Sequence, residues 1–408
     1  MTPIRRQWER RVSGLTAFAV ILGGCTSSGG VAPHAVPPAG GQANPTSRIV
    51  PSAPVVRSPI SQKVVFGDPW SSKPSSVHAI SRSALALING TRKGQVLTAS
   101  VFNLTYVGTA AALIRAHLRG VDVRVLLNSE GTDAKQVERL KRALGTRTNK
   151  RSWVVIRSSK FRMHSKFLLV SASNTRPVTV WVSSGNLTEA SGRDQANDAL
   201  VTHGDKPLYS FLARQFYLMR RGVTDPAELG RSAITPTATV RTFPIPSGGA
   251  GRDPVESMLR DVTCLSGGRP TTVRLAHYYF TDNRLYLVDL LRELKASGCV
   301  VRVVGELGVW GQAVKDALTA PGPGRIELRV ATGTILHTKI TSIDGWDSSG
   351  HPLKIAMVGT HNLSGRGLTV TPDGVNDEVA LTVGSSAVVN KYNAWVDRFI
   401  RYHSKVAA

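Results

Sequence analysis

The chain has 408 residues, of which 41% are hydrophobic and 19% are charged. Most of it can therefore bury a core, which excludes a protein that is disordered over most of its length. With 51 Lys and Arg residues against 27 Asp and Glu, the net charge is +24, which favours polyanionic partners such as nucleic acid, anionic lipid headgroups or cell-wall polymers. The same surplus fits a basic exported protein that needs it only for solubility, so charge alone does not select a partner.

Residues 1–24 have the layout of a secretory signal peptide. Arginines within the first 11 residues precede a mostly apolar run over residues 15–22, which is too short to span a bilayer as a stable helix. The order Leu-Gly-Gly-Cys that ends at Cys25 resembles a bacterial lipobox, in which Cys25 would be lipidated and become the mature N-terminus. We therefore expect an exported lipoprotein on the outer face of the cell membrane, with ordinary secretion as the alternative.

Residues 25–62 are rich in Ser, Gly, Pro and Ala and predict a flexible tether between the membrane and the folded part. Two further cysteines remain, Cys264 and Cys299. An even number of cysteines in an oxidising compartment predicts one disulfide, and two buried free thiols are the alternative.

The predicted first half, residues 63–223, alternates helical and strand patterns. This order predicts an α/β layer with helices on the faces of a sheet. In chain order we expect a helix around residues 80–88, a strand over 96–102, a helix over 109–119 that ends before Gly120, a strand over 121–127, a helix over 135–144 and a strand over 153–156.

The predicted second half, residues 254–408, repeats this order after a connection rich in Pro and Gly over residues 224–253. Four landmark pairs are separated by nearly the same number of residues, which indicates one fold duplicated within the chain. The pairs are Gly120 and Gly298, His164 and His337, Asn186 and Asn362, and Asp198 and Glu378. The matching elements are strands over 272–280, 300–304 and 326–330 and a helix over 284–296, followed by a closing helix over 391–402.

A short motif recurs at the same place in both halves. The second half has His337, Lys339 and Asp344 in an H-x-K-x4-D arrangement, followed by a segment of small residues that contains Asn362. A single H-x-K pattern is weak, because so short a sequence recurs by chance. Its value here comes from the second copy.

The first half has His164 and Lys166, then Asn186 in a similar small-residue segment, but Ser171 stands where the motif has Asp. One full and one partial motif, each followed by such a segment, resemble the phospholipase D superfamily over most of residues 75–402. The resemblance implies an internally duplicated α/β fold with two mixed sheets flanked by helices and a pseudo-two-fold active site. It also implies that the Asp of the motif is mainly a supporting residue and not a phosphate contact, so that its loss at Ser171 costs stability or positioning and leaves catalysis possible.

Strand alternation puts each His and its Lys on one face. The resemblance implies that one imidazole attacks phosphorus to form a phosphohistidine while the other protonates the leaving oxygen. By analogy with exported members, we expect His164 to be the nucleophile and His337 the general acid. Lys166, Lys339, Asn186 and Asn362 would hold the non-bridging oxygens, without a metal or another cofactor.

Each imidazole also needs an acceptor for its other nitrogen. Glu378 fits the second half, and Asp198 is its expected counterpart in the first half. Aligning the two Asn-Asp pairs instead selects Asp377. Among the remaining histidines, we interpret His361 as a loop residue, and His277 either lines the substrate cleft or packs in the core.

The reaction class is better defined than the substrate. We expect a monomeric phospholipase D that hydrolyses the headgroup phosphodiester of glycerophospholipids, because the export signal and tether would hold it at a membrane. A nuclease acting on DNA or RNA is the alternative favoured by the net charge of +24. A non-catalytic protein that binds the envelope is the third hypothesis.

Overall fold

The computed structural model describes residues 59–157 and 161–407. The predicted signal peptide, the lipidation site Cys25 and nearly all of the predicted tether lie outside the described residues. The first strand begins at Ser61, so the folded part starts slightly before the predicted position. In the part of the chain that the structure describes, no helix combines the length and the apolar character needed to cross a membrane.

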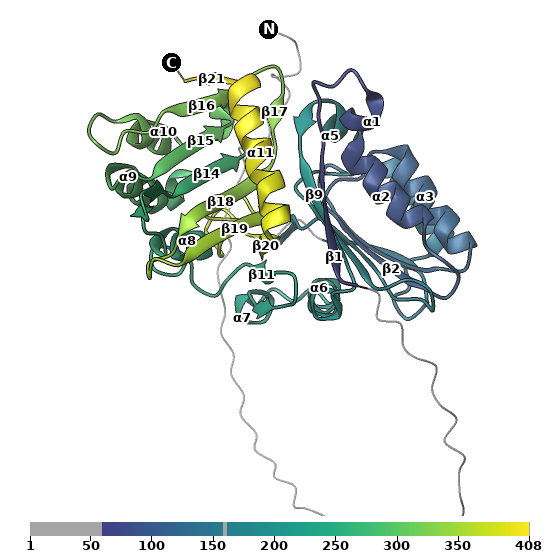
Figure 1. Ribbon diagram of the computed structural model, residues 1–408. Helices are drawn as coiled ribbons and strands as arrows, with labels where there is room; N and C mark the ends of the chain where they lie inside the picture. Colours follow the sequence, from purple (N-terminus) through teal and green to yellow (C-terminus); the bar gives the residue numbers. More distant parts are fainter. Residues whose placement is uncertain (1–58, 158–160, 408) are drawn as a thin grey trace, which may run out of the picture. The chain divides into compact units, whose positions relative to one another are not determined.

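The first half forms a seven-stranded mixed sheet in the order β1-β9-β7-β6-β2-β3-β4 (Figure 1). Strands β2, β3 and β4 run parallel, and the other neighbours are antiparallel. The strands are β1 (Ser61–Phe66), β2 (Val96–Val101), β3 (Asp122–Asn128), β4 (Trp153–Arg157), β6 (Phe167–Val170), β7 (Thr179–Ser183) and β9 (Asp198–His203). The helices are α1 (Pro74–Val77), α2 (Ala79–Asn89), α3 (Val107–Leu118), α4 (Ala134–Leu144), α5 (Glu189–Arg193) and α6 (Lys206–Arg220).

The second half repeats this strand order as β11-β20-β19-β18-β14-β15-β16, with β10 and β21 added at the two ends. The strands are β10 (Ser232–Ile234), β11 (Thr239–Phe243), β14 (Thr272–His277), β15 (Val300–Gly305), β16 (Leu328–Ala331), β18 (Lys339–Trp346), β19 (Pro352–Gly359), β20 (Asn376–Val383) and β21 (Ser404–Val406). The helices are α7 (Pro226–Leu229), α8 (Pro254–Arg260), α9 (Tyr286–Ala296), α10 (Gln312–Thr319) and α11 (Ser386–Tyr402), with short 3-10 turns at Asp282–Arg284 and Leu307–Val309 and a hairpin of β12 (Leu265–Ser266) and β13 (Arg269–Pro270).

The match between the two sheets confirms the predicted duplication. Seven strands correspond in order and direction, and the turns after α3 and α9 both use a glycine with positive φ, 85° at Gly120 and 94° at Gly298, where a side chain would be strained. The predicted connection over residues 224–253 is shorter than expected, because β11 takes the place in the second sheet that β1 takes in the first. The sequence pattern concealed β11, since Pro and Gly on both sides of it resemble a linker.

Three hydrophobic clusters hold these layers together. Alternation along β3 illustrates the division, because Val125 and Leu127 pack with α2, α3 and α4, while Leu126 points to a central cluster. That central cluster combines residues from both sheets with α6 and α11. A third cluster lies between the second sheet and α8, α9 and α10, and it includes Cys264 and Cys299. These two cysteines form a disulfide, with Cα atoms 4.5 Å apart, at the pair predicted from the sequence.

Candidate active site

The first H-x-K pair lies between a two-residue strand and the first sheet. Strand β5 (Arg162–Met163) ends directly before His164, and Lys166 directly precedes β6. The Lys166 ammonium donates to the main-chain oxygen of His164 and lies 4.9 Å from the centroid of the Phe102 ring. The same ring packs edge-on against the His164 imidazole, with centroids 4.8 Å apart. Both motif side chains are buried, so Phe102 fixes their positions from one side.

The second pair repeats this arrangement with a different aromatic residue. Strand β17 (Ile335–Leu336) ends directly before His337, and Lys339 begins β18. The Lys339 ammonium donates to the main-chain oxygen of His337. The Tyr278 ring lies 5.4 Å from this ammonium and 4.6 Å from the imidazole of His337, measured to ring centroids. Tyr278 therefore lines the site beside both side chains of the second motif.

Each histidine is bonded to the opposite half of the chain. Strand β5 pairs with the start of β20, and β17 pairs with β8 (Gln195–Ala196), both in parallel. The main-chain N–H of His164 donates to the oxygen of Asp377 at 3.0 Å, and that of His337 donates to the oxygen of Ala196 at 2.9 Å. This exchange brings the two imidazoles to one boundary, where each ring and the lysines of both motifs affect one another electrostatically.

The two rings also take their acceptors from the opposite half. Nδ1 of His164 lies 2.8 Å from the Glu378 carboxylate, and Nδ1 of His337 lies 2.9 Å from Oδ1 of Asn197. The Lys339 ammonium also lies 3.2 Å from Nδ1 of His337, but a carboxylate and an amide oxygen both accept hydrogen bonds, so the contacts with Glu378 and Asn197 favour a proton on Nδ1 of each ring. Nε2 of each ring is thereby left with a free lone pair, as a nucleophile or a proton acceptor requires.

A family model described as cardiolipin synthase, PLD-like domain, matches the chain twice, over residues 85–219 and 266–400. Together the two matches cover more than half of the sequence. The chain belongs to the phospholipase D superfamily. The two matches also confirm the duplicated fold, and membership gives phosphodiesterase-type phosphoryl transfer as the class of chemistry.

Two solved structures share the fold of this phospholipase D-like chain at low sequence identity. Polyphosphate kinase from Porphyromonas gingivalis gives a TM-score of 0.56 at 11% identity over 83% of this chain, which spans only 50% of that kinase. Phosphatidylserine synthase from Haemophilus influenzae gives 0.55 at 13% identity, covering 84% of this chain and 87% of that one. A phospholipase D family member from Salmonella typhimurium covers 39% of this chain and 93% of its own at 20% identity, with a TM-score of 0.31. No curated protein matches the sequence.

The acceptor expected at Asp198 is displaced by one residue in this phospholipase D-like site. Asn197, and not Asp198, contacts His337. The main-chain bonds of Ser184 with Asp198 and of Thr360 with Val379 show that Asn197 is the counterpart of Glu378. Side chains alternate along a strand, so aligning the two halves one residue out of register selects Asp198, whose side chain lies on the opposite face of the strand from Asn197.

Asp198 lies behind the site. Its Oδ2 accepts a hydrogen bond from the Tyr392 hydroxyl at 3.3 Å, and its Oδ1 has no partner among the described residues. Burial raises the pKa of Asp198 to about 6, against the opposing hydrogen bond of Ser184 and the charge of Lys339. Asp198 thus places a second carboxylate close to Lys339 without touching either imidazole.

Glu378 is held in one orientation by three neighbours. Besides His164, its carboxylate accepts hydrogen bonds from the Thr360 hydroxyl at 2.6 Å and from Nδ2 of Asn376 at 3.1 Å. Burial opposes ionisation, but His164, the charge of Lys166 and the hydrogen bond of Thr360 together outweigh it and hold the pKa of Glu378 below its usual value. The carboxylate is therefore ionised and acts as a fixed negative charge beside His164.

The predicted asparagines have an amide oxygen that is free within the described chain. Oδ1 of Asn186 and Oδ1 of Asn362 are buried without a hydrogen-bond partner among residues 59–157 and 161–407. Buried amides are normally satisfied, so these two groups are available to a bound ligand. Arg284 donates from Nη1 to the main-chain oxygen of Asn362 at 3.2 Å and from Nε to Asp253 at 2.7 Å. This buried ion pair, which sequence reasoning missed, fixes the loop that carries Asn362.

The cationic groups of the site are strongly destabilised in their charged forms. Burial lowers the pKa of His164 to about 4 and that of Lys166 to about 7, although Glu378 opposes both. Burial, followed by the charge of Lys339, holds the pKa of His337 well below its usual value, and burial with the charge of Lys166 does the same for Lys339. Such a site is short of negative charge, which a phosphate diester supplies.

Asp344, the last residue of the H-x-K-x4-D motif, lies away from these groups and is not one of the catalytic residues. It pairs in register with Thr272, whereas Lys339 pairs with His277, so the two occupy opposite ends of the β14–β18 pair. Five strand residues correspond to roughly 17 Å. Asp344 contacts Lys354 at 3.3 Å instead. Its counterpart Ser171 similarly accepts from the main-chain N–H of Val96 at 2.8 Å, so the motif Asp and its replacement both serve the sheet.

His277 and His361, the two further histidines considered in the sequence analysis, are buried behind the site. Nε2 of His277 lies 2.8 Å from the Thr341 hydroxyl, and its ring meets that of His361 edge-on, with centroids 5.9 Å apart. His361 is buried and stacks near Phe243 at 6.0 Å. Burial lowers the pKa of His361 to about 4 and that of His277 well below its usual value, so both are neutral.

A second ion pair that the sequence did not reveal joins the halves beside His164. Nη1 of Arg157, at the end of β4, donates to Oδ2 of Asp377 at 2.7 Å, and both side chains are buried. Asp377 is thus no ring acceptor, although one alignment selected it. In the described residues, no group of three or more His, Cys, Asp or Glu is arranged to hold a metal ion.

Proposed function

We propose that this chain is a metal-independent phosphodiesterase that acts through a phosphohistidine at His164, with glycerophospholipids as its substrates. The observation that carries the proposal is the contact of Glu378 with His164 at 2.8 Å. A fixed carboxylate on Nδ1 stabilises the positive charge that the imidazole gains when Nε2 forms a bond to phosphorus. His337 has only the neutral Asn197 at the same position, so His164 is the better nucleophile.

In the first step, Nε2 of His164 attacks phosphorus and the bond from phosphorus to the leaving oxygen breaks. The leaving oxygen takes its proton from Nε2 of a protonated His337. The free site disfavours that proton, because burial and the charge of Lys339 lower the pKa of His337. A bound phosphate anion reverses this effect by adding negative charge, so substrate binding and protonation of His337 are coupled.

In the second step, His337 acts as a base. Its neutral Nε2 takes a proton from water or an alcohol, whose oxygen attacks phosphorus while the bond to Nε2 of His164 breaks. Lys166 and Lys339 would stabilise the charge on the non-bridging oxygens in both steps. The Nδ2 groups of Asn186 and Asn362 are donors and would orient the same oxygens.

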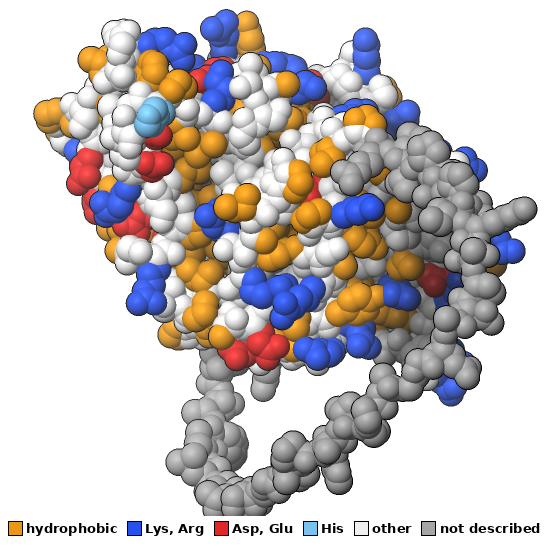
Figure 2. Space-filling model, turned by 60° about the horizontal axis from the view of Figure 1, so that its bottom comes forward, with side chains coloured by type: hydrophobic (Ala, Val, Ile, Leu, Met, Phe, Trp, Pro, Cys, Tyr) orange, Lys and Arg blue, Asp and Glu red, His pale blue; other side chains and the backbone are white. Residues whose placement is uncertain are grey.

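Two observations support a phospholipid as the substrate. The family model that matches both halves is described as cardiolipin synthase, and the N-terminal sequence predicts export and attachment to a membrane. On the face of the molecule in Figure 2, Lys and Arg side chains are scattered among hydrophobic and uncharged ones. A strand of nucleic acid is usually tracked by a continuous basic groove, and this face shows no such groove.

The experiment compares substrates for one preparation. Purified protein is incubated in EDTA with vesicles of phosphatidylcholine and, separately, with plasmid DNA. Choline release that is lost in both His164→Asn and His337→Asn supports the proposal. After acid-free denaturation, protein-bound phosphate that is labile to acid and absent from His164→Asn identifies the covalent step.

The nuclease is the second candidate, and the net charge of +24 favours it. Nicking of the plasmid in EDTA, without choline release, would support the nuclease and overturn the lipid assignment while leaving the phosphohistidine intact. Tight binding of either substrate with no turnover would instead support a non-catalytic envelope protein.

A further inference from the structure

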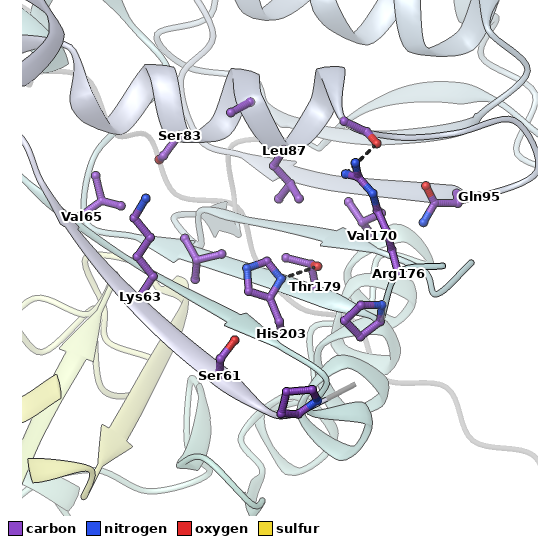
Figure 3. A pocket seen from close by; sticks show the side chains of 15 residues that line it. Ser61, Lys63, Val65, Ser83, Leu87, Gln95, Val170, Arg176, Thr179 and His203 are labelled. Atoms are coloured by element: carbon purple, nitrogen blue, oxygen red, sulfur yellow. Dashed lines mark hydrogen bonds between the residues drawn. The ribbon is translucent and has the colours of Figure 1, made fainter. Parts of the chain in front are cut away.

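A pocket of about 510 Å³ lies in the first half, between α2 and the sheet (Figure 3). Alternate residues of β1 and β9 face it, including Lys63, Val65, Val201 and His203, and α2 covers it. Val170, the last residue of β6, also lines it. Because Lys166 precedes the first residue of β6, the pocket is at the opposite end of this strand from the catalytic groups.

The inner part of the pocket is apolar. Val65, Leu87, Val170 and Val201 contribute to its lining, and their side chains come from three strands and a helix. On the helix side, the indole N–H of Trp181 donates to the Ser83 hydroxyl at 2.9 Å, which satisfies both polar groups. An aliphatic chain would therefore meet hydrophobic side chains and no unsatisfied donor at this wall.

The rim carries positive charge and nitrogen donors. Lys63, Arg176 and His203 all line the pocket, and no Asp or Glu is among its lining residues. Nδ1 of His203 lies 2.9 Å from the Thr179 hydroxyl, and Arg176 donates to the main-chain oxygen of Gly90 at 3.3 Å. In Figure 3 the His203 ring lies between the side chains of Lys63 and Arg176, and the Arg176 guanidinium points to the end of α2, where it donates to Gly90.

Two of these groups, Lys63 and His203, have no counterpart at the matching places of the second half. Lys63 pairs with Val201 in the first sheet, and Thr239 pairs with Thr382 in the second, so Thr239 stands where the first half has Lys63. Two positions after Thr382, Gly384 stands where the first half has His203. The duplicated fold does not need a lysine and a histidine at these positions. The combination of an apolar lining with a cationic rim is therefore a property of this half alone.

We propose that this pocket binds a single-chain anionic amphiphile, with its aliphatic chain between α2 and the sheet and its carboxylate or phosphate at Lys63 and His203. The volume lies in the range of pockets that bind small molecules. A basic rim without acidic residues selects an anion, and the apolar lining selects a chain over an inorganic ion. The site is independent of the reaction at the two motif histidines.

The test is calorimetric titration of the full chain with decyl phosphate, decanoate and decanol, each below its micelle concentration. We expect saturable binding of both anions at one site, and decanol at least about tenfold weaker. Each buried methylene group strengthens binding by a factor of about four. Octyl phosphate and octanoate are two methylenes shorter, so they should bind about fifteenfold less tightly than decyl phosphate and decanoate. Tighter decyl phosphate identifies a lipid phosphate as the occupant, and tighter decanoate identifies a free fatty acid.

Two variants, each with a control substitution, locate the site. Ala86 is exposed and lines the pocket, so the larger side chain in Ala86→Phe should fill the pocket and abolish binding. Asn89→Phe, on the same helix but outside the pocket lining, should leave binding unchanged. Lys63→Met should weaken both anions about tenfold and leave decanol unchanged, with the exposed Lys150→Met as the matched control.

The proposal is overturned if no saturable binding occurs, if decanol binds as tightly as the anions, or if Ala86→Phe binds like the unaltered protein. Loss of binding in His164→Asn would also overturn it, because the ligand would then occupy the catalytic site. Since the readout is binding, a failure of the proposed phosphodiesterase activity does not affect this test.

Discussion

The carboxylate of Glu378 lies 2.8 Å from Nδ1 of His164, although 214 positions separate the two residues in the sequence. The equivalent contact of His337 is with the amide oxygen of Asn197 at 2.9 Å. The two imidazoles therefore have acceptors of different charge in otherwise matching surroundings. Substituting the two acceptors should affect different parts of the catalytic cycle.

Glu378→Gln keeps the size of the side chain and removes its charge. The positive charge that His164 gains during attack loses its partner, so we expect kcat to fall about 100-fold or more. Glu378 also raises the pKa of His164 against the effect of burial. Without it that pKa falls further below about 4, and the acidic limb of the profile of kcat/KM against pH should move to lower pH. An unchanged kcat would show that the carboxylate has no role in turnover.

Asn197→Asp gives His337 an anionic acceptor. The new charge favours the imidazolium and raises the pKa of His337, so the general acid keeps its proton to higher pH. We expect the basic limb of the same profile to move to higher pH while the acidic limb stays in place. Nδ2 of Asn197 donates to the main-chain oxygen of Ser191 at 3.1 Å, so the variant should also lose about 1–3 kcal/mol of stability. A shift of the acidic limb instead would mean that the roles of the two histidines are reversed.

Arg157→Met removes the cation from a buried ion pair whose side chains are 7% and 1% exposed. Asp377 is left buried, and we expect the free energy of unfolding to fall by about 3–5 kcal/mol at alkaline pH. Burial raises the pKa of Asp377 to about 7 even with Arg157 present. The folded state therefore holds this proton more tightly than the unfolded state, and stability is lost as the pH rises through the folded pKa. The destabilisation should be smaller in acid, as measured by urea unfolding at two pH values.

Arg151→Met is the matched control for this substitution. Its side chain is 76% exposed and pairs with Asp122 at 2.8 Å, so it should cost less than about 1 kcal/mol at either pH. Adding Asp377→Asn to Arg157→Met should restore most of the stability at alkaline pH. If it does not, the cost comes from the lost packing of the arginine stem and not from the buried charge.

Asp344→Ala tests whether the Asp of the H-x-K-x4-D motif takes part in catalysis. Its partners Lys354 and Arg269 are partly exposed, at 3.3 and 3.7 Å, so we expect a stability loss below about 1 kcal/mol. Turnover should stay within about threefold of the unaltered protein, because the side chain lies roughly 17 Å along the strand from Lys339. Release of choline or nicking of plasmid, whichever the protein performs, provides the measurement. A loss comparable to that of His337→Asn would return Asp344 to the active site.

Much of the fold could be predicted because it depends on local patterns. The predicted strand over residues 121–127 and the helix over 135–144 correspond to β3 (Asp122–Asn128) and α4 (Ala134–Leu144) within a residue. Apolar strands and amphipathic helices carry these signals in their own sequence. Strand β11 carried none, since its flanking Pro and Gly residues dominate the composition of the segment.

The site was only partly predictable because its contacts join distant parts of the chain. His164 and His337 could be found from the repeated motif. The acceptor Asn197 could not be distinguished from Asp198, since the choice depends on a register of one residue that pairing across the halves determines. The pairing of Arg157 with Asp377, 220 positions apart, leaves no trace in local sequence.

The reciprocal exchange of β5 and β17 makes each copy of the duplicated unit incomplete by itself. A symmetric pair of first halves would present both rings with Asn197, and a symmetric pair of second halves would present both with Glu378. Only the fused chain combines one anionic and one neutral partner. Gene fusion thus allows a division of labour between two imidazoles that no homodimer of either copy could reproduce.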